Sequence, residues 1–140
     1  MTVSRHVVCP LHELPPGTRK IVLLNGRGPG VGVFNVSGRL YAIKNTCPHQ
    51  GGPLCLGPVC GTTRAVWPSA GPPQPEWVRD GEILRCPWHG WEFELSTGRL
   101  VAPLRERVKT YDVTVEAGAD VKRLVTYDID IEDGYIVVDA

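Results

Sequence analysis

Two short segments of the 140-residue chain each carry one cysteine and one histidine within Gly- and Pro-containing sequence. The first reads CPHQGG (residues 47–52) and the second reads CPWHGW (residues 86–91). Thiolate and imidazole are the ligands that zinc and iron centres use in proteins. If both segments serve one metal centre, the fold must bring together loops that are separated by 36 residues between His49 and Cys86.

The spacing of these ligands leaves two kinds of centre open. A single tetrahedral zinc ion usually takes paired ligands spaced as C-x₂₋₄-C and H-x₃₋₅-H, and the single spacer of Cys47-Pro48-His49 fits that pattern poorly. In a two-iron, two-sulfide cluster each segment can instead reach both metals, with its cysteine on one iron and its histidine on the other. The spacing therefore favours the binuclear cluster, with zinc as the alternative.

Composition excludes several functional classes. Fifteen Lys and Arg balance fifteen Asp and Glu, so no overall basic charge favours nucleic acid or an anionic membrane. The longest uncharged stretch, residues 45–63, is interrupted by Gly and Pro and is not expected to span a bilayer. Arg5 and His6 interrupt any apolar leader, so we expect a cytoplasmic protein. In that compartment Cys9, Cys55 and Cys60 are expected to be free thiols rather than disulfides.

The hydrophobic pattern predicts strands and no amphipathic helix. Short runs of β-branched and aromatic residues alternate with polar residues, which is typical of half-buried strands. Fourteen of the 29 Gly and Pro residues lie in residues 51–90, which predicts loops there. Residues 110–116 (TYDVTVE) recur as residues 126–132 (TYDIDIE), which predicts two similar strands, and Asp133-Gly134 predicts a two-residue hairpin turn. The predicted strands are 19–24, 30–36, 39–45, 91–95, 110–116, 124–132 and 135–138.

The longer strings CPHQGGPL and CPWHGWEFELSTGRL resemble the cluster-binding motifs of Rieske proteins, over residues 41–56 and 82–111. The resemblance implies one [2Fe-2S] cluster, with Cys47 and Cys86 on one iron and His49 and His89 on the other, near solvent. It also implies an all-β fold: an antiparallel β sandwich of three small sheets with a loop-rich cluster-binding subdomain. We expect one domain over residues 1–140, with that subdomain at about 45–102 and an insertion at about 57–81.

The same resemblance assigns positions that surround the cluster. In high-potential Rieske proteins a Ser and a Tyr follow the second histidine by two and four residues, where this chain has Trp91 and Phe93. Two cysteines that bridge the loops in those proteins correspond here to Gly52 and Trp88. These departures predict a potential in the lower part of the family range of about −150 to +300 mV. The surrounding positions are Gln50, Gly51, Trp88, Gly90, Trp91, Phe93 and Pro103, the last in a proline loop over the cluster.

The function implied is that of a ferredoxin-like electron carrier, not an enzyme, which receives electrons from a reductase and delivers them to an oxygenase or related redox enzyme. No histidine follows His89, so the two-histidine, one-carboxylate iron site of oxygenase catalytic subunits is not expected. His6, His12 and Glu13 are expected on the surface of an N-terminal strand and turn. The alternatives are a small Rieske-like subunit of a larger oxidoreductase complex such as nitrite reductase, and a zinc-stabilised interaction module. Trp67 and Trp77 make the insertion either a docking surface or a solvent loop.

Overall fold

The structure is a computed structural model that describes residues 4–24, 26–102, 104–125, 127, 129–130 and 132–140. Contacts divide the chain into two compact units, one of residues 1–45 with 109–140 and the other of residues 46–108. Nearly all regular structure is antiparallel strand, which confirms the all-β prediction. None of the helices formed by the described residues has the length and apolar character needed to cross a bilayer.

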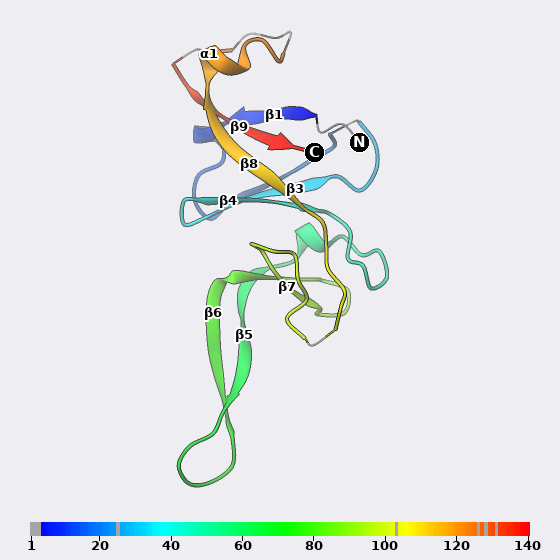
Figure 1. Cartoon of the computed structure of the whole chain (residues 1–140), viewed down its shortest axis with the longest axis vertical. Coiled ribbons are helices and arrows are strands. Elements are labelled where there is room, and N and C mark those ends of the chain that lie inside the picture. The colour runs from blue at the N-terminus through cyan, green and yellow to red at the C-terminus, as the bar shows by residue number, and fades with distance from the viewer. Residues whose placement is uncertain (1–3, 25, 103, 126, 128, 131) are drawn as a thin grey trace. The chain divides into compact units, whose positions relative to one another are not determined.

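The first unit holds six strands in the order β1-β9-β8-β4-β3-β2. The strand β8 belongs to two antiparallel groups, because its first residues pair with β4 and the remainder pairs with β9 (Figure 1). The predicted small sheets are therefore present, with the two groups of this unit continuous through β8. The elements are β1 (Arg5–Pro10), the 3-10 helix η1 (Leu11–Glu13), β2 (Arg19–Val22), β3 (Val31–Val36), β4 (Arg39–Lys44), β8 (Thr110–Ala117), α1 (Gly118–Val121) and β9 (Gly134–Asp139).

The hairpin of β3 and β4 forms where the sequence predicted it. Ser37 and Gly38 both have positive φ, 53° and 93°, which suits the right-handed twist of a two-residue hairpin. The core of this unit takes alternate positions of these strands together with β1 and β9, since successive side chains of a strand point to opposite faces. One cluster of buried residues consists of Cys9, Leu14, Val31, Val33, Ala42, Ile136 and Val138.

In the C-terminal region the predicted strands 110–116 and 135–138 are present as β8 and β9, but the predicted strand 124–132 and its hairpin turn were wrong. The described residues of 124–132 form no strand, and residues 126, 128 and 131 lie outside the described part of the chain. Instead β8 pairs with β9 from Ala117↔Gly134 to Asp112↔Asp139, so Asp133-Gly134 is not a two-residue hairpin turn. The reason is burial: β9 lies between β1 and β8, and Tyr135–Val138 are all buried, whereas 124–132 carries acids at alternate positions.

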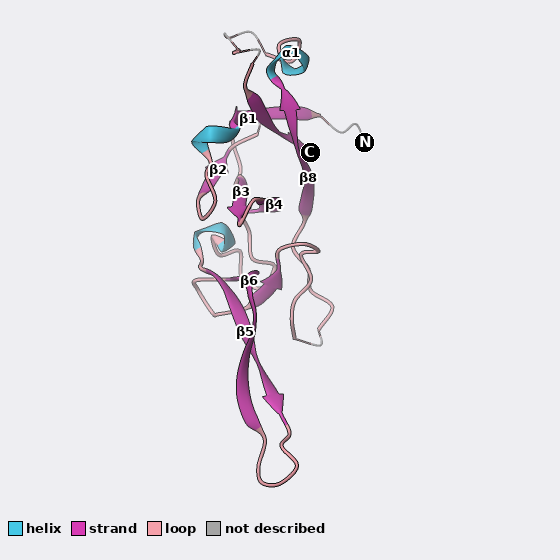
Figure 2. Cartoon of the chain, turned by 90° about the vertical axis from the view of Figure 1, so that its left-hand side faces the viewer, coloured by secondary structure: helices cyan, strands magenta, loops and turns pink. Residues whose placement is uncertain are grey.

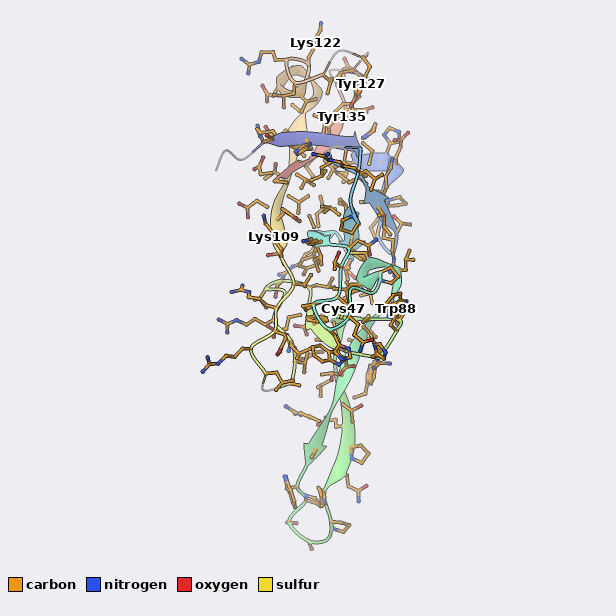
Figure 3. All side chains as sticks on the ribbon, turned by 90° about the vertical axis from the view of Figure 1, so that its right-hand side faces the viewer. Cys47, Trp88, Lys109, Lys122, Tyr127 and Tyr135 are labelled. Atoms are coloured by element: carbon orange, nitrogen blue, oxygen red, sulfur yellow. The ribbon has the colours of Figure 1, made fainter. Side chains whose placement is uncertain are left out.

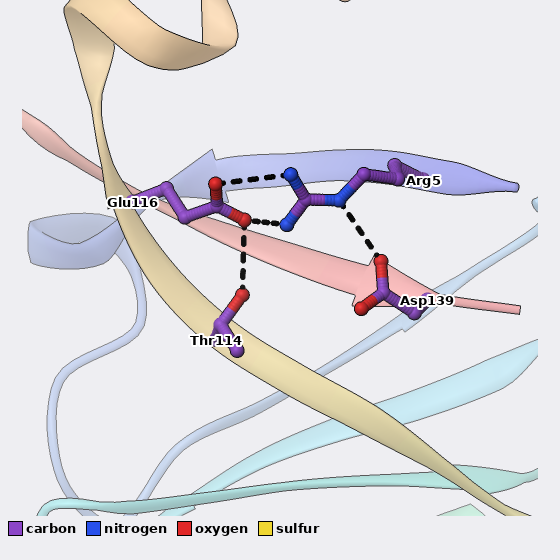
Figure 4. A network of polar contacts seen from close by, with 4 residues as sticks. All are labelled: Arg5, Thr114, Glu116 and Asp139. Carbon is purple, nitrogen blue, oxygen red and sulfur yellow. Dashed lines mark hydrogen bonds and ion pairs between the residues drawn. The ribbon is translucent and has the colours of Figure 1, made fainter.

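One polar network joins the strands of the first unit across β9 (Figure 4). The guanidinium of Arg5 on β1 forms an ion pair with both carboxylate oxygens of Glu116 on β8. Its Nε also donates to Asp139 on β9 at 3.1 Å, and the Thr114 hydroxyl donates to Glu116. A bidentate arginine with further hydrogen bonds holds its geometry better than an isolated surface pair.

The second unit contains a three-stranded antiparallel sheet in the order β5-β6-β7, with β5 (Val59–Val66), β6 (Gln74–Arg85) and β7 (Glu92–Glu94). The long β5–β6 hairpin (Figure 2) corrects the prediction of loops for residues 59–66 and 74–85, whereas residues 67–73 between these strands form an exposed loop. Proline is compatible with this hairpin because β7 pairs only with Ile83–Arg85, which leaves Pro75 on an open edge of β6. The 3-10 helix η2 (Leu54–Leu56) precedes β5.

Asn35 is the buried amide of the first unit. It is 4% exposed; its Nδ2 donates to the Leu14 carbonyl at 2.8 Å and its Oδ1 accepts the Gly38 N–H at 2.9 Å. These bonds join the segment before β2 to the β3–β4 turn.

We therefore expect Asn35→Ala to lower the free energy of unfolding by about 2 kcal/mol, because the buried Leu14 carbonyl and the partly buried Gly38 N–H both lose their partner. Urea denaturation followed by circular dichroism measures the change. Gln74→Ala removes an exposed amide and is expected to change stability by less than about 0.5 kcal/mol. Equal effects of the two substitutions would contradict the role given to Asn35.

Two glycines between β4 and β5 permit close packing in the second unit. A Cβ on Gly57 would collide with the Arg85 carbonyl oxygen, whereas a Cβ on Gly52 would lie 2.8 Å from Cδ2 of the Trp88 indole. Backbone cannot yield at Gly57, but the indole, which is 57% exposed, can move away from Gly52.

Gly57→Ala is accordingly expected to destabilise the protein by about 3 kcal/mol or more, and Gly52→Ala by about 1 kcal/mol. Thermal unfolding compares the two variants, and Gly52→Ala should in addition shift the tryptophan emission. A Gly57→Ala protein as stable as Gly52→Ala would show that this close approach is absent.

Candidate metal centre

The two Cys/His loops of the second unit share one backbone design. In the first loop the Cys47 N–H donates to the Gly52 carbonyl, and the Gly51 N–H donates to the Cys47 carbonyl. In the second loop the Cys86 N–H donates to the Trp91 carbonyl, and the Gly90 N–H donates to the Cys86 carbonyl. The hydrogen bonds thus join the same relative positions in both loops, at lengths of 2.8–3.0 Å.

A left-handed glycine closes each of these loops. Gly51 has a φ of 76° and Gly90 a φ of 74°, a conformation that side chains with a Cβ rarely adopt. Each glycine lies four residues after the cysteine, which fixes where the chain turns back. The histidines then differ in position, since His49 lies two residues after its cysteine and His89 three.

The structure places the two cysteine sulfurs next to each other and the two histidine rings next to each other. Cys47 and Cys86 are each 2% exposed, and their side chains are hydrogen-bonded to each other (Figure 3 labels Cys47). His49 and His89 are exposed, and their ring centroids lie 4.8 Å apart with the planes at 81°. The four residues that the sequence predicted as ligands thus lie together as a buried pair and an exposed pair.

The environment of Cys47 contains both burial and hydrogen-bond donors. Burial raises the pKa of its thiol, and the neighbouring Cys86 acts in the same direction. The backbone N–H groups of His49 and Gln50 hydrogen-bond to its sulfur and lower the pKa. A buried sulfur with two backbone donors suits a thiolate that is neutralised by a metal, because the donors stabilise negative charge and the pocket excludes water.

Within the described part of the chain, no three His, Cys, Asp or Glu side chains are grouped as a single metal ion would require. The donor set of two sulfurs and two imidazole nitrogens fits a two-iron cluster, whose bridging sulfides complete the coordination of each iron.

Aromatic side chains surround the two imidazoles. The Trp91 indole stacks on the His49 ring, with centroids 4.1 Å apart and planes within 12°. Trp88 covers Gly52, so the two positions that carry bridging cysteines in high-potential Rieske proteins are in contact here and hold an indole over a glycine. Phe93 is fully buried on β7 opposite Leu84. Pro103 lies outside the described residues.

Sequence reasoning missed the ion pairs at the base of the second loop. Arg85 and Glu92 face each other across β6 and β7, and the Arg85 Nη2 lies 2.7 Å from a Glu92 oxygen. The other Glu92 oxygen accepts the Thr62 hydroxyl at 2.8 Å. Arg85 and Glu92 directly flank CPWHGW. Their opposite charges at the two ends of the motif were the signal that could have predicted this ion pair.

A second ion pair joins the β5–β6 hairpin to β7. Arg79 Nη2 lies 2.8 Å from Glu94. A hydrogen bond from the Thr97 hydroxyl lowers the pKa of Glu94, and Arg79 lowers it further. The remaining candidates belong to the first unit: His6 is on β1, and His12 and Glu13 are on η1, as expected. Cys9 and Cys60 are free thiols, and Cys55 is buried on η2.

Comparison with known proteins agrees with this arrangement. Residues 4–112 match the model of the Rieske [2Fe-2S] domain family. The chain is 28% identical over 117 residues to the 3-phenylpropionate/cinnamic acid dioxygenase ferredoxin subunits of Shigella flexneri and Escherichia coli, covering 83% of this chain and 90% of each relative.

Solved structures show the same fold. The Sphingomonas yanoikuyae B1 ferredoxin superposes with a TM-score of 0.61 at 24% identity, covering 98% of this chain and 99% of that one. The ferredoxin of carbazole 1,9a-dioxygenase from Nocardioides aromaticivorans IC177 gives a TM-score of 0.59 at 22% identity, covering 100% and 98%. The family match spans most of the chain, and the two loops that it includes carry the paired cysteines and histidines. The chain belongs to the Rieske [2Fe-2S] family.

Proposed function

We propose that this protein is a single-electron carrier that delivers electrons to an oxygenase or a related redox enzyme. Cys47 and Cys86 hold one iron of a single [2Fe-2S] cluster, and His49 and His89 hold the other. The observation that carries the proposal is the pairing itself: two buried sulfurs in mutual contact and two exposed imidazoles side by side. When bound, the cluster takes up and releases one electron at a time.

The buried cysteines and the exposed histidines have different roles in this proposal. Burial of Cys47 and Cys86 excludes water from the thiolates, and the N–H groups of His49 and Gln50 stabilise the negative charge of Cys47. His49 and His89 present their rings at the surface, where a partner can approach. Trp91, stacked on His49, fixes the orientation of that ring.

The residues near the second histidine support a low potential. Trp91 and Phe93 stand where high-potential relatives carry hydroxyl donors, and neither side chain here offers a hydroxyl to a cluster sulfur. Fewer donors leave the more negative, reduced state less stabilised. We place the potential in the lower part of the Rieske range for this reason.

The names of the relatives support the choice of partners. They are ferredoxin subunits of a dioxygenase, and one similar structure is a complex of reduced oxygenase and oxidised ferredoxin, at a TM-score of 0.60 and 21% identity. By analogy we propose a reductase as donor and an oxygenase as acceptor, with no substrate turnover by this chain. We also propose a cytoplasmic location, which the free thiols of Cys9 and Cys60 support. The whole chain then acts as one Rieske domain, with residues 45–102 as its cluster-binding part.

Low-temperature EPR on anaerobically purified protein tests the function, with iron, sulfide and zinc assayed on the same sample. The proposal expects two irons and two sulfides per chain, and a rhombic signal that appears on reduction by one electron. One zinc per chain with no sulfide would instead show a structural module and would end the electron-carrier proposal.

We expect His89→Cys to lower the reduction potential, because a thiolate adds negative charge beside the irons and opposes uptake of an electron. Redox titration followed by EPR measures the change. His12→Cys is the matched control, since His12 is exposed on η1, and its potential is expected to equal that of the wild type. An unchanged or raised potential in His89→Cys would refute His89 as a ligand.

A further inference from the structure

Three arginines, Arg99, Arg105 and Arg107, gather on the loop that follows β7, and we call them the arginine patch. The loop is closed on itself, because Arg99 and Arg107 form an antiparallel bridge and the Leu100 N–H donates to the Glu106 carbonyl at 3.2 Å. All three arginines are exposed. With Glu106 as the only acid, residues 99–107 carry a formal charge of +2 in a chain whose net charge is zero.

Within the described part of the chain no patch arginine forms an ion pair, although the charge of Arg99 contributes to lowering the pKa of Glu94. Arg5, Arg64, Arg79 and Arg85 all form ion pairs with glutamates, whereas none of the patch arginines does so with another described residue. Arg107 donates only to the Thr97 carbonyl, at 3.3 Å. Guanidinium groups bind carboxylates in a planar, two-pronged geometry, so three such groups are available to an external acidic surface.

Two hollows connect the patch to the candidate metal centre. The patch arginines line a hollow of about 390 Å³ together with Leu100 and Leu104. Both leucines also line a second hollow of about 240 Å³, whose wall includes Trp91. Trp91 is the residue that stacks on His49. A continuous surface therefore leads from the exposed imidazoles, past Leu104, to the arginines.

We propose that this surface docks the protein that accepts the electron, and that the acceptor presents carboxylates to the arginine patch. Leu104, 56% exposed, supplies an apolar contact beside a charged rim, which is the usual composition of a protein interface. Opposite charges at such a rim speed association, which suits a carrier that must meet its acceptor repeatedly. This inference rests on the proposed function, because it places the acceptor beside the ring through which the electron leaves.

Stopped-flow electron transfer from the reduced holoprotein to two charged acceptors tests the proposal. The probes are cytochrome b5, which is acidic around its haem edge, and cytochrome c, which is basic there. We expect the wild-type rate with cytochrome b5 to fall at least tenfold as salt rises from about 10 to 300 mM. The double variant Arg105→Glu/Arg107→Glu should lower the low-salt rate about tenfold with cytochrome b5 and raise it with cytochrome c.

The matched control is Arg39→Glu/Arg123→Glu, which changes the formal charge equally at two exposed arginines of the other unit. We expect its rates to stay within about twofold of the wild type. Equal effects of the two double variants would overturn the proposal, since net charge alone would then set the rate. So would a labelled oligonucleotide that binds the wild type at 150 mM salt but not the patch variant, because the patch would then serve nucleic acid.

Iron, sulfide and the EPR signal of every variant separate this inference from the function on which it rests. If the wild type itself holds no two-iron cluster, the proposed function fails. If all variants hold the cluster and are reduced by one electron, but the patch substitutions leave the rate with cytochrome b5 unchanged, only the docking surface is refuted.

Discussion

The contact between the Cys47 and Cys86 thiols is the constraint on which the second unit depends. Two buried sulfurs from loops far apart in sequence lie together only if both loops have a fixed shape and a fixed separation. Shape comes from paired hydrogen bonds and a left-handed glycine in each loop. Separation comes from the approach of Gly57 to the Arg85 carbonyl and from the Arg85–Glu92 pair at the base of the second loop. These short-range contacts thereby position a site whose residues are far apart in the sequence.

The shared design of the loops also explains why their histidines are spaced differently. Each loop leaves its cysteine at the base, with the glycine four residues later turning the chain back. With the loops facing each other, one histidine two residues after its cysteine and one three residues after it bring their rings to 4.8 Å. The unequal spacing of C-x-H and C-x-x-H is thus a property of two similar loops that meet, not of one loop folding round a single ion.

How much was readable from the sequence depended on the kind of signal. The four candidate ligands, the β3–β4 hairpin and the strand β8 rest on motifs, turn residues and alternation, which are local. The β5–β6 hairpin was missed because its prolines imitate a loop, and only the short reach of β7 leaves Pro75 an open edge. The strand β9 was predicted but its partner was wrong, because TYDIDIE has a better alternating pattern than GYIVVD and was predicted as the neighbouring strand. Tertiary burial between β1 and β8 decided in favour of the apolar segment.

The net charge of the chain, like its strand pattern, does not reveal how the charged side chains are arranged in the fold. A net charge of zero suggested a chain with no electrostatic preference, yet in the described part of the chain four of the eleven arginines form ion pairs with glutamates, namely Arg5, Arg64, Arg79 and Arg85. Near the second loop, Glu94 is paired with Arg79 and Glu92 is paired with Arg85. Among the described residues, Arg105 and Arg107 of the following loop form no ion pair with an acid, so the ion pairs that rigidify the candidate metal centre leave an excess of positive charge on that loop. Stability of the loop and a charged surface for recognition then follow from one distribution of acids.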